Sequence, residues 1–318
     1  MVEKKRIEKA IWEARADYDV RRLPIVKFLD ENGKISKQSV INALKPPYPA
    51  KYYLNIVLFS FTLVVFLLWN YGLIPGQKLG FFCNDPLFSH KYNGDTVSPT
   101  VLGIGIGTLP FFVYFSIEFT RQEQWTEIFT LPSFFNFYVY AKEFIIGLVT
   151  VGGFTEIAKT IVGEHRPHFF DTCRPDTNLN CTNGIYVHTY TCTNTNVSQL
   201  EMIDASRSFP SGHSSMAWFT AIFCSYVVHR RLSSHVSGTA IKVLMVGMCL
   251  TFGLTCSLTR ITDRRHHWWD VLIGTMIGLI GSAYIIQKTQ RKILLLRKQL
   301  EEAGMNDTNH KTIDNIES

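Results

Sequence analysis

A short charged segment, residues 260–270, precedes an apolar run and contains residue types that could do chemistry. His266 and Asp270 are four positions apart, so a helix would place both on one face. A carboxylate that orients an imidazole is half of a nucleophilic or acid–base device. Arg260 could bind an oxyanion, and His267, three positions before Asp270, is the local rival of His266. The other charges are interpreted as solvated loop residues: Asp263, Arg264 and Arg265.

A second cluster, residues 208–215, opens another apolar run with the sequence Ser-Phe-Pro-Ser-Gly-His-Ser-Ser. Ser, Pro and Gly at a helix start present free backbone N–H groups and the positive end of the helix dipole, which together attract anions. Ser211 and Gly212 are therefore candidate oxyanion-binding residues, and Gly212 allows close approach of the backbone. His213 is then placed to protonate a leaving group. The alternative is an ordinary capped helix with a histidine at the membrane interface.

A third cluster ends an apolar run with Lys159 and the pair Arg166-Pro167. Lys159 and Arg166 are seven positions apart, so two helical turns return them to nearly one face. Pro167 disfavours helix at the preceding residue and is expected to release Arg166 near the surface. A lysine inside an apolar span requires an anion, and a guanidinium binds phosphate oxygens in a fork. The alternative for either side chain is snorkelling to the interface.

Long apolar runs must position these clusters, and they dominate the middle of the 318-residue chain. Mean hydropathy is only +0.07, because polar residues gather in two tails and a few loops. A run of ~20 apolar residues is long enough to cross a hydrocarbon core as a helix. We therefore predict an all-α polytopic membrane protein with six transmembrane helices: about 54–74, 97–119, 138–163, 209–229, 239–258 and 268–287.

The predicted domain organisation is a membrane domain between two polar tails. The boundaries are an amino-terminal tail at 1–53, a membrane domain at 54–288 with a long loop at 164–208, and a carboxy-terminal tail at 289–318. A polar helix should follow the last span to about Ala303, where Gly304 ends it. We expect the first span to act as an uncleaved anchor. The basic residues do not alternate with exposed aromatics, which argues against a nucleic-acid partner.

The distribution of basic residues predicts the orientation of the spans. Residues 1–53 contain twelve Lys and Arg, and residues 288–318 contain six. By the positive-inside bias both termini are cytosolic. Counting spans from there puts all three charged clusters on the same extracellular or lumenal face. The sequons at Asn180 and Asn196 also fall on that face, where glycosylation takes place.

The seven cysteines fall into two groups. Three lie inside apolar runs and are expected to be small core residues. Four lie in the two loops that the orientation places outside: Cys83, Cys173, Cys181 and Cys192. Their even number permits disulfides, with pairing inside the long loop as the favoured arrangement, but the spacing does not determine the partners.

Taken together, the three clusters resemble the lipid phosphate phosphatase group of the type 2 phosphatidic acid phosphatase superfamily. The motifs of that group appear here as Lys159…Arg166-Pro167, Pro210–His213 and Thr259-Arg260…His266…Asp270. The segments Gly80–Asp85 and Arg166–Cys173 resemble the animal members specifically. Thr259 replaces the usual Ser and keeps the hydroxyl. All catalytic residues of the group are present, so the resemblance implies an active enzyme.

The resemblance assigns a role to each candidate residue. His266 attacks phosphorus to give a phosphohistidine, Asp270 orients His266, and His213 protonates the leaving lipid oxygen. The phosphate oxygens are bound by three cations and one backbone turn: Lys159, Arg166, Arg260 and Ser211–Gly212. Because fixed cations replace a metal, the expected cofactor is none and activity should be Mg²⁺-independent.

Implied substrates are phosphatidate, lysophosphatidate, sphingosine-1-phosphate and ceramide-1-phosphate, presented from the bilayer. The plasma membrane is the favoured location, with the ER or Golgi as alternatives, and the sequence leaves a homo-oligomer open. One alternative function is a polyprenyl- or sugar-phosphate phosphatase on the same scaffold. Another is an inactive membrane protein that binds or transports lipid phosphates. Lys159 and His213 argue against the latter, because binding alone does not require a placed acid and nucleophile.

Overall fold

The computed structural model describes residues 53, 56–57, 60–61, 63–64, 67–68, 76–121, 131–176, 181–182, 184–232 and 238–314. Residues 1–52 and most of the first predicted span lie outside this set, although the described residues within that span are helical. The prediction of a first transmembrane helix at 54–74 therefore stays a prediction.

Five long helices form the body of the described chain: α4 (Pro99–Arg121), α5 (Leu131–Val162), α8 (Gly212–Arg231), α10 (Thr239–Thr262) and α11 (Trp268–Asp314). Among the described residues, four of these, α4, α5, α10 and α11, contain segments long and apolar enough to cross a membrane. The helical class of membrane protein predicted from the apolar runs is confirmed at this level. The full set of six spans stays a prediction.

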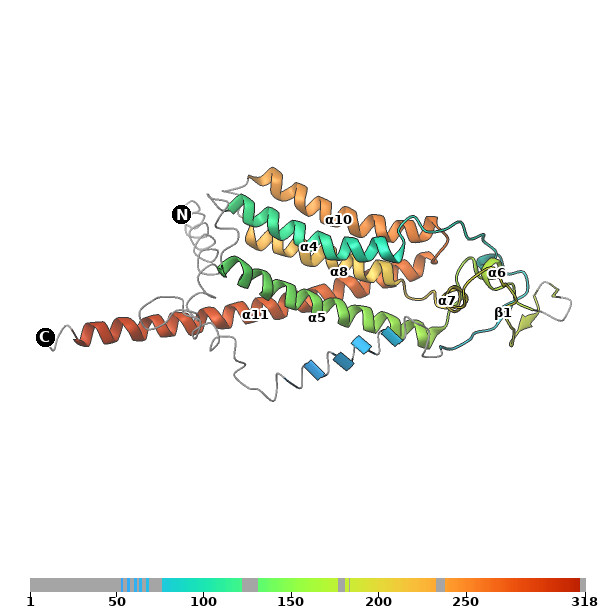
Figure 1. The fold of residues 1–318 in the computed structure, drawn as a ribbon, viewed down its shortest axis with the longest axis horizontal. Coiled ribbons are helices and arrows are strands. Elements are labelled where there is room, and N and C mark those ends of the chain that lie inside the picture. The colour runs from blue at the N-terminus through green and yellow to red at the C-terminus, as the bar shows by residue number, and fades with distance from the viewer. Residues whose placement is uncertain are drawn as a thin grey trace, which may run out of the picture.

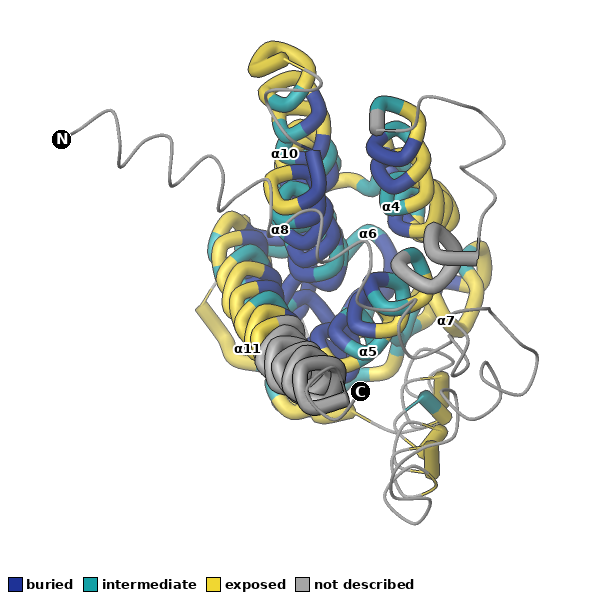
Figure 2. Tube along the Cα trace, turned by 90° about the vertical axis from the view of Figure 1, so that its left-hand side faces the viewer, coloured by how far each residue is buried: buried dark blue, intermediate teal, exposed yellow. Residues whose placement is uncertain are grey.

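Helix α8 lies at the centre and packs against each of the other four helices. Its burial is visible in Figure 2, where most of α8 is dark blue. Two glycines of α11 allow this packing: a Cβ on Gly274 would lie 2.4 Å from the carbonyl oxygen of Ser211, and one on Gly278 would lie 2.4 Å from that of Ser215. Small residues at a helix interface permit such close approach of backbones. The start of α11 is thereby held directly against the start of α8.

The four helix ends that carry the predicted clusters lie at one end of the bundle, beside α6 (Phe169–Cys173) and α7 (Gln199–Asp204) (Figure 1). These are the ends of α5 and α10 and the starts of α8 and α11. The carboxy-terminal part of α11 lies at the opposite end. The arrangement agrees with the prediction that the three clusters share one face.

The loops at this end form a small folded cap with its own apolar cluster. Strand β1 (Phe81–Phe82) pairs antiparallel with β2 (Tyr186–Val187), and η1 (Pro86–Phe88) follows β1. Aromatic rings of Phe81, Phe169 and Tyr190 pack together beneath the strands. Besides this short sheet, the described residues contain one isolated β-bridge, between Pro175 and Cys192.

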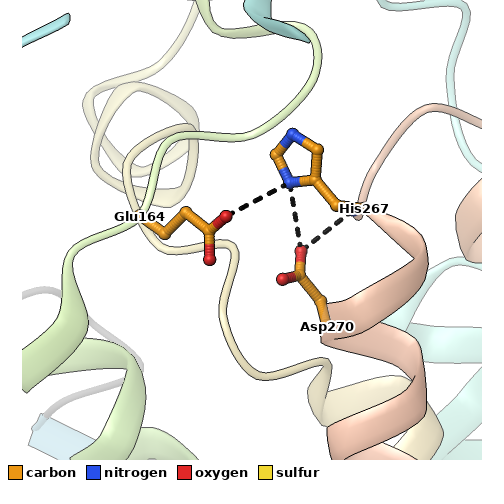
Figure 3. A group of neighbouring side chains, drawn as sticks. All are labelled: Glu164, His267 and Asp270. Atoms are coloured by element: carbon orange, nitrogen blue, oxygen red, sulfur yellow. Dashed lines mark hydrogen bonds and ion pairs between the residues drawn. The ribbon is translucent and has the colours of Figure 1, made fainter.

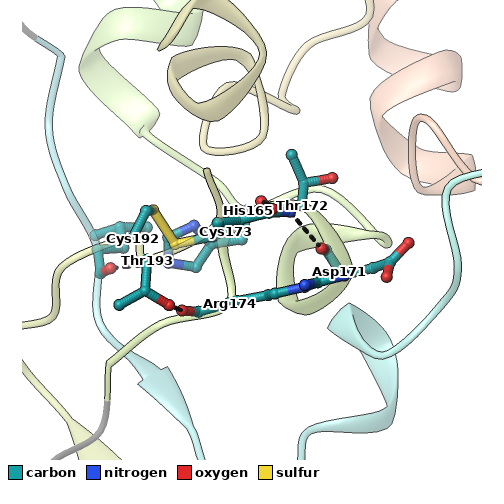
Figure 4. Close-up of a disulfide and its surroundings, with 9 residues drawn as sticks. His165, Asp171, Thr172, Cys173, Arg174, Cys192 and Thr193 are labelled. Atoms are coloured by element: carbon teal, nitrogen blue, oxygen red, sulfur yellow. Dashed lines mark hydrogen bonds between the residues drawn. A yellow bond between two sulfur atoms is a disulfide. The ribbon is translucent and has the colours of Figure 1, made fainter. Parts of the chain in front are cut away.

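Two disulfides join the cap. Cys173 and Cys192 are bonded within the long loop (Figure 4), as favoured from the sequence. Cys83 and Cys181 are bonded across the two outer loops, which corrects the expectation that pairing stays within the long loop. Pairing across 98 positions depends on the contact of β1 with β2, which spacing alone does not reveal. The three remaining cysteines are free and buried, as predicted: Cys224, Cys249 and Cys256.

Helix α11 corrects the predicted end of the last helix, because it continues through Gly304 to Asp314. A glycine inside a helix costs about 1 kcal/mol relative to alanine. Since extending an existing helix is far easier than starting one, such a cost does not by itself end the helix.

Candidate active site

The start of α8 forms the floor of the site. Ser211 is the N-cap: its Oγ accepts from the N–H of Ser214, and its own N–H donates to the carbonyl of Asp270 at 3.0 Å. A Cβ on Gly212 would lie 3.2 Å from the Nζ of Lys159, so the ammonium group lies directly against this turn. A side chain at this position would be in tight contact with the lysine. The predicted oxyanion turn and the predicted lysine are therefore adjacent.

His213 occupies the first turn of α8 next to that floor. Its Nε2 atom is buried and makes no hydrogen bond within the described part of the chain. The ring lies within electrostatic reach of Arg260, His266, Lys159 and Arg166. An unpaired buried ring nitrogen among cations is free to interact with a bound anion or leaving group.

His266 is buried, and its Nδ1 lies 3.4 Å from Oδ2 of Asp270 and 3.4 Å from Oγ of Ser208. The pair is not formed on one helix face as expected, because α11 begins two residues after His266. Instead Oδ2 of Asp270 is fixed by hydrogen bonds from the Ser208 hydroxyl at 2.5 Å and the backbone N–H of His267 at 2.9 Å. Asp270 therefore caps the start of its own helix while it faces the imidazole.

Burial and, to a smaller extent, Arg166 lower the pKa of His266 to about 3, although Asp270 opposes both effects. A ring with such a pKa is neutral near pH 7. With Nδ1 toward Asp270, the lone pair would be left on Nε2. This is the state that a nucleophilic imidazole requires.

His267 lies at nearly the same distance from Asp270, with Nδ1 3.5 Å from the same Oδ2 atom. Distance to the carboxylate therefore does not separate the two histidines, but their surroundings differ. The charges that act on His266 include Arg166 and Lys159. The ring of His267 instead stacks on Trp269 with centroids 4.5 Å apart and lies 3.6 Å from a carboxylate oxygen of Glu164.

Lys159 is held by a carboxylate that sequence reasoning missed. Its Nζ donates to Oε1 of Glu156 at 2.8 Å, and Oε2 of Glu156 accepts from Arg207 at 3.1 Å. All three side chains are buried. Glu156 lies one helical turn before Lys159, so a carboxylate inside an apolar run was a usable signal. Arg207, 51 positions away in the chain, offered none.

Arg166 is also buried, which corrects the expectation that Pro167 releases it near the surface. Helix α5 ends at Val162, and Gly163 turns the chain with a positive φ of 64°. Arg166 then donates from Nε to the carbonyl of Asp204 at 2.7 Å and from Nη2 to its carboxylate at 2.6 Å. Lys159 and Arg166 therefore do not share a helical face. The Arg166 side chain is held in the interior by its hydrogen bonds to Asp204, the last residue of α7.

The ion pair between Arg166 and Asp204 determines the charge state of both side chains. Burial lowers the pKa of Arg166 to about 10, although Asp204 opposes the effect, so the guanidinium stays charged near pH 7. Burial would raise the pKa of Asp204, but Arg166 and Arg265 outweigh it and hold that pKa well below its usual range. The pair is therefore ionised on both sides.

Arg260, the third predicted cation, is only 1% exposed and is held by two carboxylates. It donates to Oδ1 of Asp95 at 2.9 Å and to Oδ2 of Asp263 at 3.0 Å. Asp263 in turn accepts from the N–H and the hydroxyl of Thr96. Asp263 is thus not a solvated loop charge, and that interpretation was wrong.

The interpretation of Arg265 as a solvated charge was wrong as well. Its guanidinium contacts Oδ1 of Asp95 at 3.1 Å and Oδ2 of Asp204 at 2.9 Å. It also lies 3.1 Å from Nε2 of His168, a buried ring whose pKa is lowered to about 3 by burial, Arg166 and Arg265. Of the three loop charges, Arg264 alone is exposed.

The two predicted glycosylation sites have different outcomes. Asn196 is exposed in the cap, whereas Asn180 lies outside the described residues. Glycosylation at either position stays a prediction.

The comparisons with known proteins agree with the class of site. A family model described as the PAP2 superfamily matches residues 140–294, which include all three clusters. Residues 140–294 are therefore similar to a PAP2 superfamily domain.

Curated proteins to which the chain is similar include phospholipid phosphatases of animals. Phospholipid phosphatase 1 of Mus musculus is 29% identical over 214 residues, covering 64% of this chain and 72% of that protein. Phospholipid phosphatase homolog 1.2 homolog of Caenorhabditis elegans is 29% identical, covering 67% and 65%. Phospholipid phosphatase 2 of Homo sapiens is 28% identical, covering 66% and 72%. No solved structure matches the chain.

Proposed function

We propose that this protein is a lipid phosphate phosphatase that hydrolyses phosphate monoesters of membrane lipids without a metal cofactor. One observation carries the proposal: Lys159, Arg166 and Arg260 all lie within electrostatic reach of His213 at the start of α8, together with His266, which is backed by Asp270. Phosphoryl transfer needs charge stabilisation at the phosphate oxygens and an in-line nucleophile, and this set of residues supplies both.

In the proposed reaction, Nε2 of His266 attacks phosphorus and the bond to the lipid oxygen breaks. His213, which takes up a proton when the anionic phosphate binds beside it, gives that proton to the lipid oxygen, so the lipid leaves as an alcohol. Asp270 stabilises the charge that develops on His266. Water, deprotonated by His213, then attacks the phosphohistidine, releases inorganic phosphate and restores His266. Lys159, Arg166 and Arg260 bind the phosphate oxygens in both steps.

The paired carboxylates explain how three cations stay in place before substrate binds. An uncompensated buried charge is strongly unfavourable, and removing one partner of a buried pair costs about 3–5 kcal/mol. Each cation here has a carboxylate partner: Glu156 for Lys159, Asp204 for Arg166, and Asp95 with Asp263 for Arg260. The site is therefore preorganised for an anion.

The substrate class follows from the position of the site at the ends of membrane-length helices. A phosphate head group can enter there while its acyl or sphingoid tail stays in the bilayer. Phosphatidate, lysophosphatidate, sphingosine-1-phosphate and ceramide-1-phosphate all fit this description. One alternative is a polyprenyl- or sugar-phosphate phosphatase built on the same scaffold. The other is not an enzyme but a membrane protein that binds lipid phosphates.

Full-length protein purified in detergent is expected to release phosphate from this lipid panel in the presence of EDTA. The reason is that fixed cations supply the charge stabilisation that a metal would otherwise provide. Phosphate release is measured for each lipid alongside a polyprenyl phosphate and a sugar phosphate. Strict dependence on Mg²⁺ would contradict the mechanism, and turnover confined to the last two substrates would favour the alternative enzyme.

We further propose that the site faces the extracellular or lumenal side and that both termini are cytosolic, with the plasma membrane as the favoured location. The disulfide-bonded cap supports this orientation, because disulfides persist in oxidising compartments. An epitope tag at either terminus is expected to bind antibody only after cells are permeabilised. Staining of intact cells would overturn the orientation without affecting the proposed chemistry.

A further inference from the structure

We propose that Glu164, His267 and Asp270 form a binding site for Zn²⁺ that inhibits the enzyme. One ligand atom from each residue lies within 4.8 Å of the other two. Figure 3 shows the imidazole of His267 between the two carboxylates, which come from the segment after α5 and from the first turn of α11. The inhibitory part of the inference rests on the proposed function, whereas the binding part does not.

The distances suit a small transition-metal ion. Nδ1 of His267 lies 3.6 Å from Oε1 of Glu164 and 3.5 Å from Oδ2 of Asp270. Two ligands of a tetrahedral Zn²⁺ with bonds of 2.0–2.1 Å are separated by about 3.3 Å. A contraction of a few tenths of an ångström would bring Nδ1 to the ligand spacing with either carboxylate, and the two carboxylate oxygens lie within 4.8 Å of each other. Three protein ligands leave a fourth position for water.

The unsatisfied polar atoms of His267 and Asp270 independently indicate that an ion could bind here. His267 is only 7% exposed, yet neither of its ring nitrogens makes a hydrogen bond within the described part of the chain. Oδ1 of Asp270 is likewise buried without a partner there. Buried polar atoms normally have partners, so an imidazole that faces two carboxylates without a hydrogen bond is in the position of an unused ligand.

The donor set favours Zn²⁺ over Mg²⁺ or Ca²⁺. A neutral imidazole with two carboxylates is a common Zn²⁺ ligand set, whereas the harder cations prefer oxygen ligands alone. Glu164 also accepts from Nε1 of Trp269 at 2.9 Å, and Trp269 stacks on His267. These contacts fix the orientation of two of the three ligands, as outer-shell partners do in metal sites.

Binding at this place should inhibit because Asp270 is shared. The carboxylate that would coordinate Zn²⁺ is the one whose Oδ2 atom faces Nδ1 of His266 at 3.4 Å. A dication on the carboxylate withdraws its negative charge from His266 and opposes the positive charge that develops there during attack. The metal is therefore an inhibitor of a metal-independent reaction and not a cofactor for it.

The binding experiment uses full-length protein in detergent, stripped with EDTA and then dialysed against radioactive Zn²⁺. One equivalent is expected to bind per chain at micromolar free Zn²⁺. Glu164→Gln keeps the acceptor for Trp269 but loses the charge, and it should weaken binding by about tenfold or more. His267→Gln should do the same. The matched control is His188→Gln, which removes an exposed histidine of the same cap and should leave binding unchanged.

The activity experiment compares phosphate release from lysophosphatidate with and without Zn²⁺. Wild type and His188→Gln should be inhibited reversibly, with recovery in EDTA. Glu164→Gln should keep its basal rate and need about tenfold more Zn²⁺ or higher for half inhibition. The proposal is overturned if Glu164→Gln and His267→Gln bind Zn²⁺ like wild type, or if Zn²⁺ inhibits Glu164→Gln and wild type alike. Absence of any lipid phosphatase activity would instead count against the proposed function, because the binding result stands apart from it.

Discussion

Replacing His266 with alanine is expected to reduce phosphate release from lysophosphatidate by a factor on the order of 10⁴ or more. The reason is that the alternative route, direct attack by water, lacks a nucleophile backed by a carboxylate. Brief incubation of wild type with a radioactive phosphate donor, followed by denaturation, should trap a label on the protein that is labile in acid and stable in base. The same label should be missing from His266→Ala.

The matched control is His267→Ala, because the neighbouring histidine lies almost equally close to Asp270. We expect this variant to keep the label and most of the activity, since the ring of His267 stacks on Trp269 and faces Glu164 instead of the cations. A label that persists in His266→Ala and disappears in His267→Ala would falsify the assignment of the nucleophile. Thermal unfolding of both variants checks that neither loss reflects a damaged fold.

The helical membrane class and the three clusters could be predicted from the sequence, because both leave strong local signals. Apolar runs of membrane length are a strong signal, and ionisable residues at their ends are costly unless they are used. Because helices α5, α8, α10 and α11 bring those ends to one side, residues such as Lys159, Arg260 and His266 lie together in the structure.

Two of the carboxylates that hold the cations, Asp95 and Asp204, were not predictable in the same way. Asp95 pairs with Arg260 across 165 positions, and Thr96 with Asp263 across 167, so only the folded cap brings them together. Asp204 reaches Arg166 from α7, a short helix inside a long loop. Local spacing carries no information about such pairs, and for the same reason Arg265 was wrongly interpreted as solvated. Asp263 was a different case, because its pairing with Arg260 three positions earlier was a local signal that was missed. The disulfide between Cys83 and Cys181 likewise joins distant positions and could not be predicted from local spacing.

Replacing His213 with glutamine is expected to lower turnover of lipid phosphates by about 10²–10⁴-fold, the usual contribution of a general acid. Glutamine approximates the size and polarity of the ring but cannot transfer a proton at neutral pH. Nε2 of His213 is buried without a hydrogen bond within the described part of the chain, next to the turn at Gly212. The interpretation of His213 as a residue of an ordinary capped helix predicts instead a change in stability alone, visible in thermal unfolding.

A change of leaving group separates a proton donor from a residue that merely supports the fold. A lipid alcohol leaves as a strongly basic alkoxide and needs the proton, whereas a nitrophenolate is a weak base and leaves without one. His213→Gln should therefore lose much less in the first step with a nitrophenyl phosphate than with lysophosphatidate. Because His213 also activates the water of the second step, the variant should release one burst of nitrophenol and then turn over slowly as the phosphohistidine accumulates. Equal losses on both substrates, without a burst, would show that His213 acts on the fold or on phosphate binding and not on the proton.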